Sequence, residues 1–493
     1  MRTNPRHPTE NLLRRLGDPR LFREQAYVDG KWCSARDGAV QAVTNPSTGA
    51  VIGHVPNLGG AETDAAIAAA YAAFPAWAAA LPQERAAVLR RWHAAMVAHR
   101  EDLAVLMTAE QGKPLAEARG EIDYAASFVE WFAEEARRLN VESVTPHLPD
   151  CSMSVRRVPV GVTAAITPWN FPCAMITRKA AAALAAGCPM VVRPASETPY
   201  SALALAELAE RAGVPAGVFS VVTGEPQPIV GALTASPLVR ALSFTGSTAV
   251  GRALLAASAA TVKRVSMELG GHAPFILFPD VPLDEAVAAA VAAKFATSGQ
   301  DCLAANRLYV HRGAYDRFVH GFARAVAALT VGDGFAPGTD IGPLMHERAV
   351  AKCEEHVADA LAKGARLVTG GKRLGGLFYQ PAVLADVTPA MRIHREETFG
   401  PVAAVIPFDD GDDIAAMAND SEYGLAAYLF TNDARRIQRL TAALDYGMVA
   451  VNRVKMTGAP VPFGGVKQSG LGREGSRHGI EEFTEIKYVC MAA

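Results

Sequence analysis

Short apolar runs alternate with helical runs along the middle of the chain. Residues 160–167 are almost entirely apolar, and residues 177–186 then follow a helical pattern. A second apolar run at 190–192 is followed by an amphipathic stretch at 200–212. Strands that alternate with helices in this way predict a parallel sheet with helices on both of its faces.

The alternation continues through a second region that starts near Val262. Further strands are predicted at 218–222, 242–245, 266–269, 275–278, 307–310, 366–368, 378–384 and 402–407, and further helices at 247–260, 284–297 and 315–329. A single hydrophobic core rarely serves more than about 250–300 residues. Because the chain has 493 residues, the pattern predicts an α/β fold with at least two parallel-sheet domains.

Two segments lie outside this alternation. Residues 152–158 alternate in residue type as an exposed strand does, and residues 485–489 are suited to pair with it. An unpaired strand edge invites pairing with another chain. We therefore expect residues 139–160 and 478–493 to form a small β flap for oligomerisation, with strand pairing between subunits.

Composition and charge exclude several classes of function. The formal net charge is −2 and basic residues do not cluster, so no nucleic-acid partner is expected. No apolar run approaches the roughly 20 residues that span a bilayer, which predicts no membrane association. The seven cysteines are widely spaced and none forms a C-x-x-C pair, so neither a metal site nor a disulfide framework is indicated. A cytoplasmic location fits these features.

Four segments carry side chains that are suited to catalysis or to ligand binding. They read TPWNFP at 167–172, FTGST at 244–248, MELGG at 267–271, and GQDC at 299–302 with EETFGP at 396–401. In this order and at these spacings they resemble the aldehyde dehydrogenase superfamily over nearly the whole chain. The stretches 168–179, 194–199 and 470–475 look like its succinate-semialdehyde dehydrogenase branch.

This resemblance implies a domain organisation. It implies two Rossmann-like domains: a dinucleotide-binding domain of residues 1–138 and 161–269, and a catalytic domain of residues 270–460. The cofactor it implies is NADP or NAD, and the assembly it implies is a homodimer or homotetramer.

The residue types suit the oxidation of an aldehyde, because hydride does not leave a planar carbonyl until a nucleophile has made a tetrahedral adduct. The resemblance assigns this nucleophile to Cys302. It assigns the oxyanion donor to the Asn170 amide, together with the Cys302 backbone N–H. By the same resemblance Glu268 is the base that directs water onto the thioester, and Lys179 is its partner in the proton path.

The cofactor site is also implied residue by residue. Arg193 and Ser196 favour NADP, since a guanidinium suits a phosphate and a neutral serine does not repel it, although NAD use stays open. The implied contacts are Thr167, Pro168, Trp169, Arg193, Ser196, Gly246, Ser247, Leu269, Glu397 and Phe399.

The substrate side departs from the pattern of the branch. Arg178, Thr457 and Phe463 match its pocket and imply an anionic tail, but the second arginine of the branch is replaced by Ala296. Arg453 is a candidate to replace that arginine, as is the nearby Lys455. The alternative is a different tail, as in glutarate semialdehyde or a sulfonated or phosphonated aldehyde.

Asp301 is unusual beside a nucleophile, because a carboxylate so close can raise the pKa of the thiol. Two other functions remain open at this point. A CoA-acylating dehydrogenase is disfavoured by Glu268, which such relatives usually lack, and a non-enzymatic protein is disfavoured because Cys302, Asn170 and Glu268 are all present.

Overall fold

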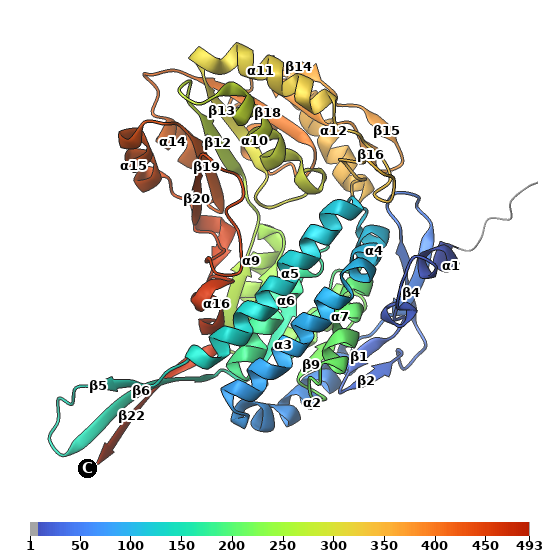
Figure 1. The fold of residues 1–493 in the computed structure, drawn as a ribbon, viewed down its shortest axis with the longest axis vertical. Coiled ribbons are helices and arrows are strands. Elements are labelled where there is room, and N and C mark those ends of the chain that lie inside the picture. The colour runs from blue at the N-terminus through green and yellow to red at the C-terminus, as the bar shows by residue number, and fades with distance from the viewer. Residues whose placement is uncertain (1–7, 493) are drawn as a thin grey trace, which may run out of the picture.

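The computed structural model describes residues 8–492, so residues 1–7 and 493 of the predicted ranges lie outside the described part. Two large sheets, each covered by helices on both faces, stack one above the other, and a β flap projects from them (Figure 1). This confirms the predicted α/β fold with two Rossmann-like parallel-sheet domains and a small β flap.

The first sheet has eight strands in the order β2-β1-β9-β8-β7-β10-β11-β21. The five strands from β9 to β11 run parallel, and the strands beyond them pair antiparallel at each edge. The bounds are β1 Ala26–Val28, β2 Lys31–Cys33, β7 Val162–Ile166, β8 Met190–Arg193, β9 Phe219–Val221, β10 Val239–Thr245, β11 Arg264–Glu268 and β21 Gly470–Leu471.

Helices bury both faces of this sheet in separate cores. One core contains side chains of α3 to α7, and the other contains side chains of α2, α8 and α9. The bounds are α2 Gly60–Ala79, α3 Pro82–Ala98, α4 Arg100–Gln111, α5 Leu115–Glu135, α6 Ala174–Ala186, α7 Pro199–Arg211, α8 Pro226–Ala235 and α9 Thr248–Ala259. Burial on both faces explains why the strands are continuous apolar runs.

The second sheet has seven strands in the order β14-β17-β18-β13-β12-β19-β20, all parallel to their neighbours except β14. Its two faces are covered by α10 and α11 on one side and by α12 to α15 on the other. The bounds are α10 Leu283–Phe295, α11 Arg312–Ala327, α12 Glu347–Ala362, α13 Arg392–Arg395, α14 Ile414–Asn419, α15 Ala434–Ala443, β12 Ala273–Leu277, β13 Ala305–His311, β14 Arg366–Thr369, β17 Ala382–Ala385, β18 Val402–Phe408, β19 Ala426–Phe430 and β20 Met448–Val451.

Two predicted elements end differently in the structure. The strand predicted over 378–384 is divided into β16 Phe378–Tyr379 and β17, because Pro381 lies between them and cannot donate to a ladder. The helix predicted over 284–297 ends at Phe295, because Thr297 and Ser298 adopt left-handed φ values of 50° and 58°. This turn redirects the chain toward Cys302.

The flap consists of β5 Glu142–Val144, β6 Cys151–Pro159 and β22 Thr484–Ala492. The predicted pairing of the two segments occurs, since β22 runs antiparallel to β6 with Glu485 opposite Val158. In Figure 1 this ribbon extends away from both sheets and carries the C-terminal end. Both partner strands belong to one chain, and pairing between subunits stays a prediction.

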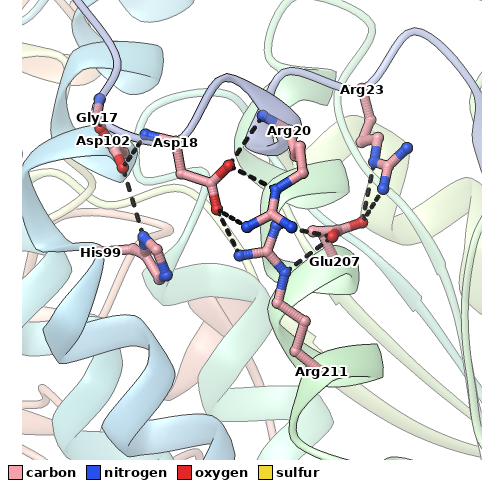
Figure 2. A network of polar contacts seen from close by, with 8 residues as sticks. All are labelled: Gly17, Asp18, Arg20, Arg23, His99, Asp102, Glu207 and Arg211. Carbon is pink, nitrogen blue, oxygen red and sulfur yellow. Dashed lines mark hydrogen bonds and ion pairs between the residues drawn. The ribbon is translucent and has the colours of Figure 1, made fainter.

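The N-terminal segment is fastened to the first domain by polar contacts (Figure 2). Asp102 on α4 accepts hydrogen bonds from the backbone N–H groups of Gly17 and Asp18 at 2.6 and 3.1 Å. Arg211 on α7 donates to Asp18 at 2.7 Å. These contacts hold the segment that precedes β1 against the helical face.

No single helix among residues 8–492 has the length and apolarity needed to cross a membrane. The bent pair α2 and α3, with 117° between its helices, passes the same test by length and composition only.

Candidate active site

Chemically active side chains gather at the carboxyl ends of the parallel strands of the first sheet. Asn170 follows β7, Arg193 ends β8, Gly246 follows β10 and Glu268 ends β11. Ligands of open parallel sheets bind at this edge. Cys302 approaches it from the second domain, in the loop that leads into β13.

Cys302 lies where two cavities meet. It contributes to the walls of a cavity of about 490 Å³ and of another of about 290 Å³. Gly271 allows its own loop to approach the nucleophile loop closely, because a Cβ at Gly271 would lie 2.1 Å from the Cys302 carbonyl oxygen. Burial, reinforced by Asp301, raises the pKa of the Cys302 thiol well above its usual range.

Asn170 is buried beside the nucleophile. One hydrogen of its Nδ2 donates to the Gln300 carbonyl oxygen at 3.0 Å, which fixes the amide. The amide nitrogen carries two hydrogens, so one stays available to a ligand. Lys113 holds the backbone of Asn170 from behind, donating to its carbonyl oxygen at 2.7 Å.

Glu268 is 2% exposed, and within residues 8–492 neither of its carboxyl oxygens has a hydrogen-bond partner. Burial, together with the charge of Glu474, raises the pKa of this carboxyl well above its usual range. The backbone of Gly464 passes close by, and a Cβ there would lie 2.8 Å from Glu268 Oε1. Such a carboxyl keeps its proton to a higher pH than an ordinary glutamate does.

Lys179 does not bond Glu268 directly. Its Nζ donates to Thr245 Oγ1 at 2.7 Å and to Glu474, which also forms an ion pair with Arg178. Burial lowers the pKa of Lys179, and Glu474 opposes that shift. Arg178, predicted to bind the substrate tail, therefore already faces a carboxylate and lies 4.1 Å from the centre of the Phe463 ring.

Sequence reasoning assigned no role to Glu474. It lies beyond β21, in the Gly-rich stretch 470–475, and Lys179 is 295 positions away. Its one sequence signal is a charged residue within a glycine-rich run. Burial opposes the ionisation of its carboxyl, but Arg178 and Lys179 outweigh burial and lower its pKa.

Replacing Glu474 by alanine leaves two buried cations without their counter-charge, since Arg178 and Lys179 are at most 1% exposed. We expect a loss of about 3–5 kcal/mol of folding free energy, measured by urea denaturation. The matched control is Glu422→Ala, which removes the exposed partner of Arg252 and costs about 1 kcal/mol or less. Equal losses for the two variants contradict the assigned role of Glu474.

The larger cavity has the size of a cofactor site. Its walls include Pro168, Trp169, Gly246, Ser247, Leu269, Glu397 and Phe399, all predicted cofactor contacts, together with His346, Arg348 and Lys352, which were not predicted. Thr167 precedes this group and is buried, with its hydroxyl unpaired among the described residues.

The contacts inside this cavity suit a dinucleotide. Ser247 caps the N-terminus of α9, where backbone N–H groups favour a diphosphate. Trp169 packs edge-on against Phe399, with ring centres 5.6 Å apart. Glu397 accepts from the Gly271 N–H at 3.0 Å, and burial raises its pKa to about 7. A free carboxyl oxygen and a flat aromatic wall fit a nicotinamide ribose and ring.

Arg193 and Ser196 lie together at the end of β8. Arg193 donates to Ser196 Oγ at 2.6 Å and to the Gly224 carbonyl oxygen at 3.1 Å. Neither residue is among those that form the 490 Å³ cavity in the described part of the chain. They lie two strands away from the Gly246 turn, because β7 separates β8 from β10.

The smaller cavity brings together Arg178, Thr457 and Phe463 with Cys302, as the sequence predicted for substrate contacts. Arg453 and Lys455 are exposed, and neither is among the residues described as lining it. Asp301 does line it, together with Glu117 of α5, to which no role had been assigned.

Comparison with known proteins fits this site. Residues 32–489 match the aldehyde dehydrogenase family. The chain is 56% identical to the succinate-semialdehyde dehydrogenase [NADP(+)] GabD of Escherichia coli, covering 97% of this chain and 99% of that protein. It is 57% identical to the non-phosphorylating aspartate-semialdehyde dehydrogenase of Halomonas elongata, covering 98% of each.

The fold is shared as well. The crystal structure of an E. coli NADP-dependent enzyme superposes with a TM-score of 0.96 at 56% identity, covering 97% of this chain and 100% of that one. These matches confirm the resemblance drawn from the four sequence segments. The chain belongs to the aldehyde dehydrogenase family, whose members oxidise aldehydes with a nicotinamide cofactor.

Proposed function

We propose that this chain oxidises a carboxylate-bearing aldehyde of the succinate-semialdehyde type to the acid, through a thioester on Cys302 and with NADP⁺ or NAD⁺. The observation that carries the proposal is the position of Cys302 on the walls of both cavities. A nucleophile there reaches an aldehyde in the smaller cavity and a cofactor in the larger one.

Residues of the chain perform the addition step. The Cys302 thiol releases its proton to solvent water and the sulfur attacks the carbonyl carbon, whose C=O π bond breaks to give a tetrahedral adduct with a negative oxygen. The free hydrogen of the Asn170 amide and the Cys302 backbone N–H stabilise that oxygen. When bound, the nicotinamide supplies the hydride acceptor that converts the adduct into a thioester.

Release of the product needs a base. Glu268 takes a proton from water, whose oxygen attacks the thioester carbon and displaces the Cys302 sulfur. Lys179, Thr245 and Glu474 form the buried polar chain beyond it. A base in this position supports hydrolysis rather than transfer of the acyl group to CoA, which is the less favoured alternative.

The first domain, residues 1–138 and 161–269, holds the cofactor in this proposal, and residues 270–460 carry the nucleophile. Ser247, Glu397 and Phe399 contact the diphosphate, ribose and nicotinamide. Arg193 and the neutral Ser196 accept a 2′-phosphate, which favours NADP⁺. Within the smaller cavity, Arg178 and Thr457 face the substrate carboxylate.

The test is a steady-state comparison of aldehydes with both cofactors. Succinate semialdehyde should exceed butanal in kcat/KM by about tenfold or more, since a charged hydrogen bond is lost with butanal. Glutarate semialdehyde and a sulfonated aldehyde test the alternative tails. A clear preference for butanal overturns the carboxylate assignment, and a better kcat/KM with NAD⁺ overturns the NADP⁺ preference.

A further inference from the structure

The charges around the smaller cavity do not balance. Two cations, Lys113 and Arg178, line it. Lys113 Nζ lies 2.6 Å from Glu121 Oε2, and Arg178 is paired with Glu474. Because all four side chains are at most 4% exposed, each cation already has a carboxylate partner that water does not screen.

Two further carboxylates line the same cavity, near these cations but without an ion pair to either of them. Glu117 on α5 accepts from the Thr297 backbone N–H at 3.2 and 3.1 Å, and Asp301 accepts from the Leu303 backbone N–H at 3.0 Å. Neither carboxylate forms an ion pair with a described residue. Burial raises the pKa of both carboxyl groups, although the charge of Lys113 opposes that shift, and the charge of Asp301 adds to the rise for Glu117 and for the Cys302 thiol.

The charge of Asp301 therefore opposes the ionisation of the neighbouring nucleophile more strongly than the charge of Arg178 favours it. A cation placed between Asp301 and Glu117 offsets both carboxylates and removes this opposition. The cavity of about 290 Å³ is the space that the proposed function gives to the substrate, so the substrate itself is the natural source of that cation.

We propose that the substrate carries a protonated amine, held by Glu117 and Asp301, in addition to its aldehyde. This inference rests on the proposed function and narrows it: with a carboxylate toward Arg178 and Thr457, the substrate is a short amino-acid semialdehyde.

Four aldehydes separate the two charges. The compound 2-amino-4-oxobutanoate has both amine and carboxylate, 3-aminopropanal has the amine, 4-oxobutanoate has the carboxylate, and butanal has neither. We expect the amine to raise kcat/KM at least tenfold, with or without the carboxylate, mainly through KM. Equal or lower kcat/KM with the amine overturns the inference.

Two variants locate the contact. Asp301→Asn and Glu117→Gln keep an acceptor for the Leu303 and Thr297 N–H groups while removing the charge. With the amino-acid semialdehyde as substrate, each variant should show a KM at least tenfold higher, and in each variant the advantage of 2-amino-4-oxobutanoate over 4-oxobutanoate in kcat/KM should be lost. Glu285→Gln, which neutralises an exposed acid on α10, is the matched control and should change neither.

The outcomes distinguish failure of the proposed amine site from failure of the proposed dehydrogenase activity. If butanal and 4-oxobutanoate are oxidised but the amine gives no advantage, the amine site is wrong and the dehydrogenase stands. If none of the four aldehydes is oxidised with either cofactor, the proposed function itself fails. If both variants lower kcat/KM for all four aldehydes equally, the carboxylates are structural and the amine contact is overturned.

Discussion

Replacing Cys302 by alanine should abolish aldehyde oxidation, with kcat reduced by a factor on the order of 10⁴ or more. The sulfur forms the covalent bond in the proposed mechanism, and no other described thiol lines either cavity. Initial rates of NADPH formation measure the loss. Mass spectrometry of enzyme quenched during turnover should find an acyl adduct on Cys302 that the variant lacks.

The controls distinguish lost chemistry from a lost fold. Cys302 is partly exposed in the cavity, so its truncation should shift the unfolding midpoint little, and NADPH binding by fluorescence should persist. Cys33→Ala removes another partly exposed thiol, on β2, and should retain activity. More than about a hundredth of the activity remaining in Cys302→Ala, far above the level expected on losing a nucleophile, contradicts the thioester mechanism.

Glycine and proline residues at the ends of elements explain why the strands and helices of the first sheet were predicted closely. The helix predicted at 200–212 is α7, Pro199–Arg211, because Pro199 begins it and Gly213 follows it. The strand predicted at 190–192 is β8. Glycine and proline act on their own backbone, so a short window of sequence contains what is needed.

The walls of the substrate cavity could not be predicted in this way. Glu117 reaches a backbone N–H 180 positions away, at Thr297. Nothing in the local sequence of α5 indicates that contact, since an acidic residue early in a helix is common for electrostatic reasons alone. Only the packing of α5 against the start of the nucleophile loop makes Glu117 part of the cavity.

Arg178 was predicted to lie in the substrate pocket, but its charge partner could not be predicted from the sequence. Its sequence position predicted a cavity wall, and it lines the smaller cavity. The sequence did not predict its pairing with Glu474, which changes what the guanidinium offers to a ligand. The charge of a substrate can be predicted from a cation in the cavity wall only when the buried neighbours of that cation are known. Those neighbours come from distant segments of the chain.

Replacing Glu268 by glutamine should separate the two halves of the reaction. Addition and oxidation do not need this carboxyl in the proposed mechanism, so a first burst of NADPH should persist, while steady turnover falls by about 10²–10⁴, the usual contribution of a general base. Rapid-mixing absorbance measures both phases. Loss of the burst together with turnover contradicts the assignment of Glu268 to thioester hydrolysis.

The pH dependence gives an independent readout of the same group. A base must be ionised to act, and burial with the Glu474 charge raises the pKa of Glu268. Turnover of the native enzyme should therefore increase with pH through a range well above that of an ordinary glutamate, and Glu268→Gln should lack this rise. Glu268→Asp keeps a base in the same buried place and should keep the rise at a lower rate. If turnover of the native enzyme does not change with pH above the usual pKa of a glutamate, the base is another residue.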